Sequence, residues 1–363
     1  MKYTRLAEYV LQMDTYKDLD YAFAEESYWN IFGKGGCTAC VKSLPNGDTI
    51  VGRNMDLYYS NKPAYIVRTD VEGEYKTLGF AYSYLSGPDY KEVLSNGLSE
   101  EDIKKIPFTC CDIINEHGLY MEINMRNGEF NEDGSSVYLC TGTNPKAKKR
   151  VCSLSLQRHV VNHCKNIDEA LEYINNELNI YTPFNENLPW NFCFILAEPG
   201  GRHGLLEIAE NKISWLEGQD AQTNFYITKE FADKEQLKCG LGRYDYVMDK
   251  LNSINNEDDM FKMMESIQYS NIYRPDPVCD IRTEWVGVKP HWTTDYVLLE
   301  ENRAEIEEMI DHDMKKFASL SREELMDGGT FWESVFTVVA NCEKRSLMLR
   351  CFEDESKTFN LEL

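Results

Sequence analysis

The dipeptide Asn46-Gly47 constrains the fold of this chain more than any other feature of its sequence. It separates two strand-like runs, Cys37–Leu44 and Asp48–Asn54. Asn-Gly between two such runs is the strongest short-range signal for a β-hairpin, because both residues tolerate the positive φ that a tight turn requires. The sequence therefore predicts an antiparallel hairpin whose second strand ends beside the start of the first.

Three reactive side chains lie at the open end of this hairpin. Cys37 follows Gly35-Gly36, and Arg53 and Asp56 come at the end of the second strand. The two glycines have no Cβ, so a backbone carbonyl can approach the sulfur closely. A thiol ordinarily has a pKa of about 8.5 and attacks as the thiolate, so it needs a nearby cation or base at neutral pH. The pattern is typical of a nucleophilic cysteine.

Less specific interpretations of the same residues remain open. Free cysteines are most often buried packing residues. Arg53 could be a surface residue paired with Asp56, and Asp56 could cap the turn that follows it. Cys37 and Cys40 also form a CxxC pattern, but redox motifs of this kind open a helix rather than a hairpin, so thioredoxin-like chemistry is disfavoured.

Composition excludes several classes of function. The chain has 363 residues, is 42% hydrophobic and carries a net charge of −23. It is long enough for a large globular core, and its acidity argues against nucleic-acid or anionic-membrane partners. It has no apolar run of about 18 residues, so we expect no membrane span. With no signal peptide and 12 cysteines that fit reduced thiols, we expect a cytoplasmic protein.

No metal or cofactor site is expected. His159 and His163 lie four residues apart on a predicted helix, but no Glu or Cys stands in register with them, and a metal site needs more ligands than two. The sequence has no Gly-rich phosphate loop.

Blocks of strands alternate with blocks of helices, which indicates an α+β fold. Met1–Gly36 is expected to be a helical N-terminal extension, either packed on the domain or removed as a pro-segment, and 37–363 to form one domain. Further strands are predicted at Ala64–Thr69, Tyr75–Tyr84, Phe192–Ala197, Gly204–Ala209, Lys212–Leu216, Phe225–Thr228, Phe331–Ala340 and Ser346–Phe352. Helices are predicted at Tyr21–Phe32, Val151–Cys164, Ile167–Leu178, Arg243–Ile254, Glu257–Ile267 and Arg303–Leu320.

The motifs Cys37-Thr38-Ala39 and Gly52-Arg53-Asn54-Met55-Asp56 resemble the opening of the choloylglycine hydrolase family, which are linear-amide hydrolases with an N-terminal nucleophile. Later stretches resemble the same family in the same order: Asn115–Leu119, Leu188–Glu207, Gln222–Asn224 and Thr330–Phe336. The resemblance implies a four-layer αββα sandwich of two antiparallel sheets, the N-terminal nucleophile hydrolase fold.

The resemblance also implies autocatalytic cleavage between Gly36 and Cys37. The sulfur would attack the Gly36 carbonyl, and the freed α-amine, with a pKa near 7.7–8, would then serve as the base of the mature nucleophile. Arg53 would lower the pKa of the thiol and help to orient the substrate. Asp56 would accept a hydrogen bond from the Cys37 amine.

Three further positions match residues of the family's site. Asn224 matches the asparagine of the oxyanion hole. Asn124 is the candidate second donor, although it falls one residue earlier than the family's usual asparagine or tyrosine. Arg243 resembles the family's last active-site arginine.

The function implied is hydrolysis of a linear, non-peptide amide of a small N-acyl substrate. Conjugated bile salts, penicillin V-like compounds and N-acyl amines or amino acids are the classes that the resemblance offers, and a homo-oligomer is compatible with it. Two alternatives stay open. One is acyl transfer to an amine instead of water, and the other is a catalytically silent binding protein of the same fold.

Overall fold

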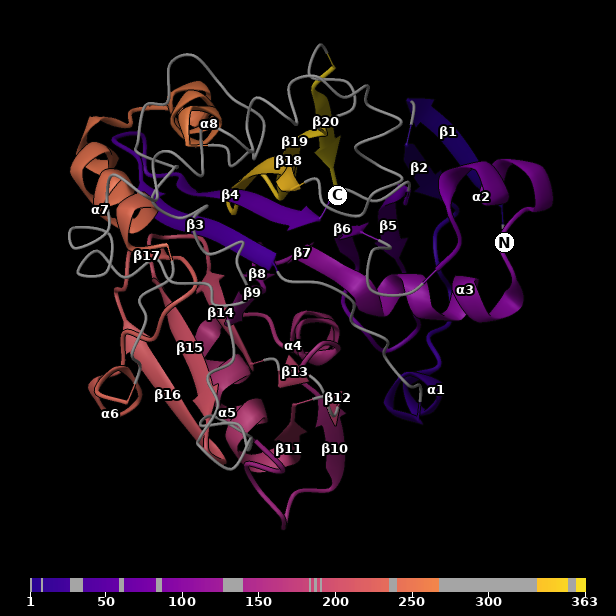
Figure 1. Cartoon of the computed structure of the whole chain (residues 1–363), viewed down its shortest axis with the longest axis horizontal. Helices are drawn as coiled ribbons and strands as arrows, with labels where there is room; N and C mark the ends of the chain where they lie inside the picture. The colour runs from indigo at the N-terminus through magenta and orange to yellow at the C-terminus, as the bar shows by residue number, and fades with distance from the viewer. Residues whose placement is uncertain are drawn as a thin grey trace, which may run out of the picture.

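The structure is a computed structural model. It describes residues 2–7, 9–26, 35–58, 62–82, 87–126, 140–182, 184–185, 188–189, 191–234, 240–267, 332–351 and 357–363. Two β-sheets face each other, and helices lie outside both (Figure 1). The expected α+β architecture is confirmed, and the candidate nucleophile lies between the two sheets.

The larger sheet has ten strands in the described part of the chain. Its order is β1 (Tyr3–Ala7), β2 (Val10–Met13), β5 (Ala64–Thr69), β6 (Thr77–Tyr82), β7 (Cys110–Asn115), β8 (Tyr120–Glu122), β14 (Asn191–Ala197), β15 (His203–Ala209) and β16 (Lys212–Glu217), with β9 (Asn124–Arg126) also paired to β14. All pairs are antiparallel except β2 with β5. Its inner strands are buried almost throughout, because the second sheet covers one face and helices cover much of the other, whereas the edge strands β1 and β16 are largely exposed or half-buried.

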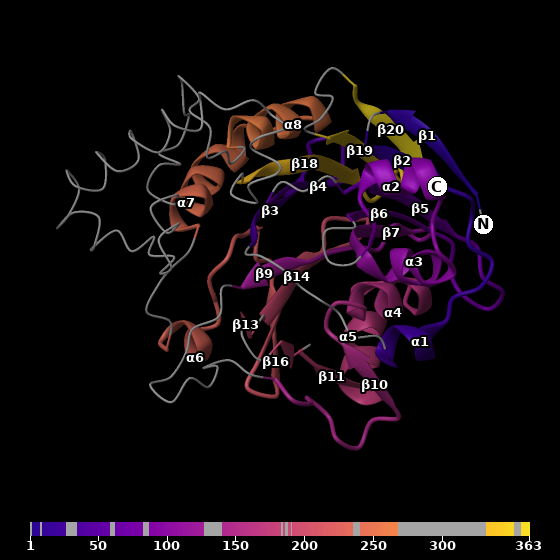
Figure 2. The same cartoon turned by 45° about the vertical axis from the view of Figure 1, so that its right-hand side comes forward.

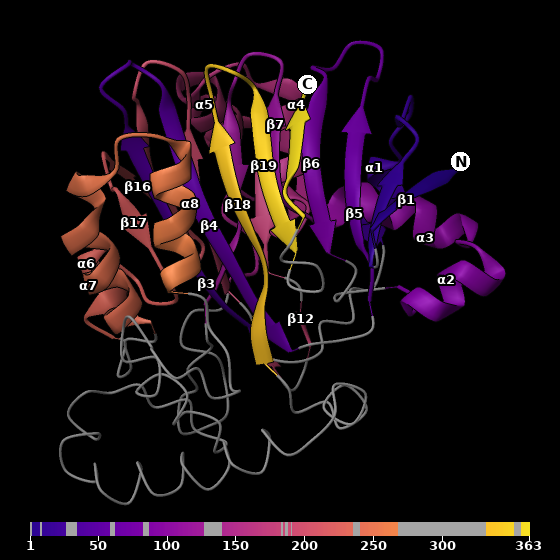
Figure 3. The ribbon, with the colours of Figure 1, turned by 90° about the horizontal axis from the view of Figure 1, so that it is seen from above.

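The smaller sheet contains the predicted hairpin. Its order is β17 (Ala221–Gln222), β3 (Gly35–Ser43), β4 (Thr49–Tyr58), β18 (Trp332–Asn341), β19 (Ser346–Cys351) and β20 (Phe359–Glu362), all antiparallel. β3 and β4 are joined through Gly47 at φ 94°, the left-handed conformation that glycine favours. Figure 3 shows β4, β18 and β19 side by side across this sheet.

Helices form the two outer layers. α4 (Leu156–His163) packs on β7 and β8 and α5 (Ile167–Glu177) packs on α4, whereas α7 (Leu241–Lys250) and α8 (Glu257–Ser266) cover the smaller sheet (Figure 2). Close approach of α8 requires Gly52, since a Cβ there would lie 2.6 Å from the sulfur of Met260. The four-layer arrangement is therefore present.

Shorter elements complete the described fold. They are α1 (Tyr21–Glu26), α2 (Tyr90–Asn96), α3 (Glu100–Lys105), the 3-10 turns η2 (Ile106–Thr109) and η3 (Leu251–Ser253), α6 (Lys229–Ala232), and the strand pairs β10 (Lys149–Cys152) with β11 (Leu178–Tyr181) and β12 (Phe184–Asn185) with β13 (Leu188–Pro189).

The helical expectation for the first residues is wrong. Tyr3–Ala7 and Val10–Met13 form a two-stranded hairpin, with Tyr9 at φ 60° in its turn. Val10–Met13 is short, and a short apolar run has no decisive period. β2 gains ladder hydrogen bonds by pairing with β5, which a local helix could not provide. Only Tyr21–Glu26 of the second predicted helix is helical in the described residues, which stop at Glu26 and resume at Gly35.

Two other expectations need correction. The stretch Phe225–Thr228 is not a strand, because the Glu207 carboxylate accepts the backbone N–H groups of Ile227 and Thr228, each at 2.8 Å, in place of a neighbouring strand. The helix predicted at Val151–Cys164 starts only at Leu156, since the preceding residues form β10. The helix predicted at Arg303–Leu320 lies outside the described residues.

Candidate active site

The β3–β4 hairpin places Cys37 and Arg53 on one face of the smaller sheet. Cys37 pairs with Met55, and Ala39 pairs with Arg53. Alternation along β4 turns Asn54 to the opposite face, where its side chain donates to the Met264 carbonyl of α8. Cys37 and Arg53 therefore point into the space between the sheets, away from α7 and α8.

Arg53 is fully buried and spans the gap between the two sheets. Its Nε donates to Glu122 at 3.0 Å, and its Nη1 donates to Asp112 at 3.1 Å. Its Nη2 donates to the Ile123 carbonyl at 2.7 Å and lies 3.5 Å from the Cys37 sulfur. The expectation that Arg53 adjoins the thiol is met, whereas the alternative of a surface ion pair with Asp56 is wrong.

The Cys37 thiol is only 2% exposed. Burial raises its pKa to about 11, which outweighs the lowering effect of the Arg53 guanidinium. The carboxylates of Asp56 and Glu122 raise the same pKa further. In the uncleaved chain the thiol is thus mostly protonated at neutral pH, and it needs a base to react.

Asp56 and Arg243 form a second network on the opposite face of the hairpin. Arg243 Nη1 donates to Asp56 at 2.9 Å and to the Cys37 carbonyl oxygen at 2.8 Å. The same nitrogen donates to Thr38 Oγ1 at 2.7 Å. Ser334 of β18 donates to the other oxygen of Asp56. All five residues are buried, so this network fixes the backbone at the nucleophile.

Asn224 contacts the peptide at the nucleophile. Its Oδ1 accepts the Cys37 backbone N–H at 3.1 Å and Arg243 Nη2 at 3.0 Å. Its Nδ2 donates to the Met125 carbonyl at 2.7 Å. The amide of Asn124 is fully buried, and neither its oxygen nor its nitrogen has a hydrogen-bond partner among the described residues. An orphaned buried amide of this kind is a candidate ligand-binding group.

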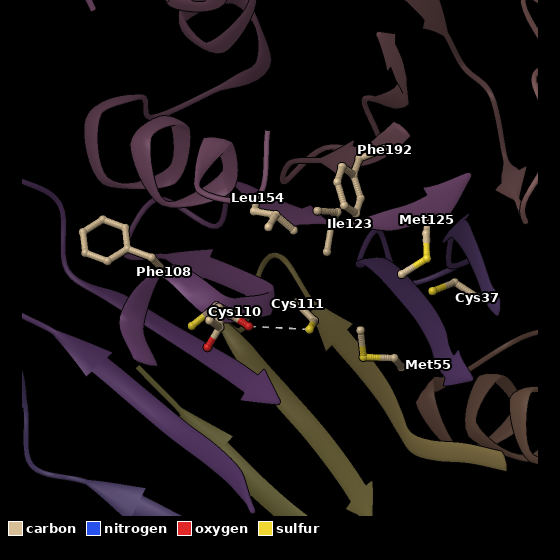
Figure 4. A pocket seen from close by; sticks show the side chains of 10 residues that line it. Cys37, Met55, Phe108, Cys110, Cys111, Ile123, Met125, Leu154 and Phe192 are labelled. Carbon is tan, nitrogen blue, oxygen red and sulfur yellow. Dashed lines mark hydrogen bonds between the residues drawn. The ribbon is translucent and has the colours of Figure 1, made fainter. Parts of the chain in front are cut away.

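A small apolar pocket opens beside the sulfur. It is lined by Cys37, Met55, Phe108, Thr109, Cys110, Cys111, Ile123, Met125, Leu154 and Phe192. Figure 4 shows Cys37 at one end of the pocket and Phe108 toward the other. Almost all of the exposed lining is apolar, which suits a hydrocarbon or aromatic group rather than a charged one.

The structure brings Cys37, Arg53, Asp56, Asn224 and Arg243 together around one short stretch of β3, and Gly36 pairs with Asp56 within the same strand pair. Asn124 lies on β9 of the facing sheet.

Sequence reasoning missed two carboxylates of the site, Asp112 and Glu122. Each interrupts an apolar strand, as in Cys110-Cys111-Asp112 and Tyr120-Met121-Glu122. A lone carboxylate in an apolar strand is a signal for a buried ion pair. Its partner Arg53 lies 59 and 69 residues away, so the sequence could not identify the pairing.

The other described residues give little support to alternative chemistry. Among them, no cluster of three His, Cys, Asp or Glu side chains could hold a metal, and no described helix is both long and apolar enough to cross a membrane. His159 contacts Glu25 at 3.2 Å, and His163 contacts the His159 carbonyl at 2.8 Å. The two histidines thus have protein partners.

Comparison with protein families found one match. The sequence model of the family described as "Acyl-coenzyme A:6-aminopenicillanic acid acyl-transferase" matches residues 43–275. The matched range includes Arg53, Asn124, Asn224 and Arg243, and it starts after Cys37. A search of curated proteins found no significant match.

Several solved structures are similar to this chain. A variant of the conjugated bile acid hydrolase from Clostridium perfringens is 13% identical, with a TM-score of 0.46 over 90% of this chain and 92% of that one. A second variant of that enzyme is 14% identical, with a TM-score of 0.44 and the same coverage. Penicillin V acylase from Agrobacterium tumefaciens is 11% identical, with a TM-score of 0.44 over 90% of this chain and 86% of that one.

Proposed function

Because the chain belongs to the family described as acyl-coenzyme A:6-aminopenicillanic acid acyl-transferase, we propose that it cleaves a linear, non-peptide amide through a thioester on Cys37. One observation carries the proposal: the Cys37 sulfur lies 3.5 Å from a buried guanidinium and lines an apolar pocket. A nucleophile, a fixed cation and a site for an acyl group are thus adjacent.

The reaction needs a base that the uncleaved chain lacks. Burial holds the pKa of the Cys37 thiol near 11, so thiolate is scarce at pH 7. We propose that the sulfur first attacks the Gly36 carbonyl, that the thiol proton passes to the Cys37 nitrogen as the Gly36–Cys37 bond breaks, and that water then hydrolyses the thioester and leaves a carboxylic acid on Gly36. The exposed α-amine of Cys37 then takes the thiol proton during attack on the substrate carbonyl. The amine product leaves with a proton, and water cleaves the thioester.

The networks on the two faces of the hairpin serve different parts of this cycle. Arg53 directs one N–H to the sulfur and favours negative charge there. Asp56 and Arg243 hold the Cys37 carbonyl and the backbone around it. Asn224 already contacts the Cys37 nitrogen at 3.1 Å, so it can orient the α-amine once it is free.

Asn124 and Asn224 are proposed as donors to the oxyanion. Asn124 Nδ2 is buried and has no hydrogen-bond partner among the described residues, so it can donate to a developing negative charge. Removal of one such donor typically costs about 3–4 kcal/mol of transition-state stabilisation. The expected substrates carry an apolar acyl group, as in conjugated bile salts, penicillin V-like amides or N-acyl amines and amino acids.

The enzyme is proposed to act in the cytoplasm. The nine cysteines whose side chains the structure describes are all free and buried, which suits a reducing compartment.

Acyl transfer to an amine is the second candidate. The matched family is named for an acyl-transferase, and the same thioester can react with an amine instead of water. Products analysed with and without an added amine distinguish the two: transfer gives a new amide, whereas hydrolysis gives only the free acid.

Covalent labelling tests the nucleophile directly. An N-acyl probe with an apolar chain should add its acyl mass to Cys37, and Cys37→Ala should abolish labelling, amide cleavage and scission of the Gly36–Cys37 bond while the fold survives. Cys111→Ala is a matched control, because Cys111 is buried and lines the same pocket. Labelling or amidase activity that persists in Cys37→Ala would rule out the proposed mechanism.

A further inference from the structure

The Arg53 guanidinium is held in one orientation by acceptors from the facing sheet. Glu122 accepts from Nε at 3.0 Å, Asp112 from Nη1 at 3.1 Å and the Ile123 carbonyl from Nη2 at 2.7 Å. Because the guanidinium is planar and its five donors have fixed directions, these contacts determine where the remaining Nη2 hydrogen points. That hydrogen is directed at the Cys37 sulfur, which lies 3.5 Å from Nη2.

The two carboxylates are themselves fixed. The second oxygen of Glu122 accepts the Ile195 backbone N–H at 3.0 Å, and the second oxygen of Asp112 accepts the Tyr120 hydroxyl. Glu122, Asp112 and Arg53 are all 0% exposed. Neither carboxylate can turn away from the cation without leaving a buried donor unpaired, and an unpaired buried donor is destabilising.

The charge of this cluster can change near neutral pH. Burial raises the pKa of Glu122 to about 7, Arg53 lowers it and Asp112 raises it again. When both carboxylates are ionised they carry one more charge than the single guanidinium. The titratable or charged groups that face Glu122 among the described residues are Arg53 of β4, Asp112 of β7, Tyr120 of β8, Cys37 of β3 and Cys193 of β14.

We propose that Glu122 is a positioning residue of the Cys37 site, which aims the Arg53 guanidinium at the sulfur and, by gaining or losing its own proton, sets how strongly that cation favours the thiolate. This inference rests on the proposed role of Cys37 as the nucleophile. With Glu122 protonated, Asp112 alone offsets the cation and the thiolate is better stabilised. With Glu122 ionised, the extra negative charge opposes the thiolate.

The pH dependence of Cys37 alkylation tests this directly. The rate of iodoacetamide modification at Cys37, followed by peptide mass spectrometry, should rise about tenfold per pH unit while the thiolate is a minor species. In the native protein we expect this rise to flatten around the Glu122 pKa of about 7, because each Glu122 that ionises raises the pKa of the thiol. If the logarithm of the Cys37 alkylation rate rose linearly with pH across this range in the native protein, the proposal would be overturned. This measurement needs no variant.

Glu122→Gln should remove the flattening, since the amide keeps an oxygen for Arg53 Nε but does not ionise. Alkylation at pH 8 should then increase by roughly three- to tenfold, which corresponds to a fall of about half to one unit in the pKa of the thiol. Asp112→Asn reaches the same cation from β7 and should act in the same direction. If both variants fold and keep the native pH dependence of Cys37 alkylation, the proposal is contradicted.

Glu207→Gln is the matched control. Glu207 is also a fully buried glutamate of the larger sheet, paired with Arg126 at 2.9 Å, but it does not contact Arg53. Its variant should keep the native flattening, and loss of the flattening there would also count against a specific role for Glu122.

Amide cleavage separates this inference from the proposed function. If Cys37 shows the expected profile but no N-acyl substrate is cleaved, only the proposed function fails. If substrate is cleaved through Cys37 and the profile is unchanged in Glu122→Gln, only the positioning role fails. Glu122→Ala, which removes the acceptor as well as the charge, should lower kcat more than it raises KM.

Discussion

At the scale of single residues, the site depends on charges that compensate one another in the absence of water. Arg53 has two carboxylate partners, both 0% exposed. Taking charges out of water is expensive, so an ion left alone in such a place is strongly destabilising. Sequence reasoning treats Arg53 as a residue that acts on the thiol. The structure adds that Arg53 also neutralises the interior between the sheets.

Substitution of Arg53 should therefore affect stability as well as reactivity. Arg53→Ala leaves Asp112 and Glu122 buried without a cation, and we expect the free energy of unfolding to fall by about 3–5 kcal/mol, measured by urea denaturation. The triple variant Arg53→Met, Asp112→Asn, Glu122→Gln removes all three charges and should regain most of this loss. A melting temperature of Arg53→Ala close to the native value would show that the carboxylates do not depend on Arg53.

At the scale of helices and strands, the sequence predicts the elements that local sequence signals specify. The β3–β4 hairpin follows from Asn46-Gly47 and places Cys37 beside Met55. The sequence does not predict β2, because its pairing with β5 is a long-range contact that a four-residue segment cannot encode. Nor does it predict that the Glu207 carboxylate accepts backbone N–H groups in the stretch Phe225–Thr228, since that contact depends on a side chain from another strand.

The candidate site likewise has contacts that follow from local sequence signals and contacts that depend on distant parts of the chain. The positions of Cys37 and Arg53 follow from the register of one hairpin. The partners of Arg53 come from the facing sheet and could not be inferred from spacing. Asp56 is engaged by Arg243 and Ser334 on the far face of the hairpin, so it is poorly placed to accept the thiol proton in the uncleaved chain.

One element-level contact links α1 to the pocket. Glu25 accepts the Cys152 backbone N–H at 2.6 Å and the Ser155 hydroxyl at 2.7 Å. Leu154 lies between these two residues and lines the pocket. Glu25 therefore fixes the segment that leads into α4.

Loss of that carboxylate should loosen this segment. Glu25→Ala leaves the Cys152 N–H without its acceptor, so we expect the free energy of unfolding to fall by about 1–3 kcal/mol and acyl labelling of Cys37 to slow. Glu101→Ala is the control, because Glu101 forms only a surface pair with Lys105 that contributes about 0–1 kcal/mol. Equal effects of the two substitutions on urea denaturation would mean that Glu25 has no special role.

At the scale of the whole molecule, the resemblance read from scattered motifs is confirmed by the family match over residues 43–275, although the matched family is named for an acyl-transferase. The expected sandwich of two antiparallel sheets is confirmed as well. The place of the first residues in the molecule differs from the expectation. They supply two strands of the larger sheet, whereas the sequence suggested a helical appendage.

The described residues before Cys37 contact the rest of the molecule through strand pairing, backbone hydrogen bonds and buried apolar side chains. β2 pairs with β5, and the Tyr16 backbone continues the contact through hydrogen bonds with Arg68 and Asp70 at 2.9 and 2.8 Å. Val10 and Leu11 are 0% exposed. Figure 3 shows β1 and β5 at the same edge of the molecule. Removal of this segment would expose both the edge of β5 and the apolar surface beneath it.

We therefore predict that cleavage at Gly36–Cys37 does not release the upstream segment from the folded protein. Denaturing mass spectrometry of the active protein should show two chains that separate at this bond, while native mass spectrometry and gel filtration should show a single complex. The cleavage-blocked variant Cys37→Ala provides the one-chain reference under both conditions. Gel filtration that separates the segment from a fully active remainder would contradict the prediction, because the larger sheet would then fold without β1 and β2. An active protein that stays in one piece under denaturing conditions would instead show that Cys37 works without a free α-amine.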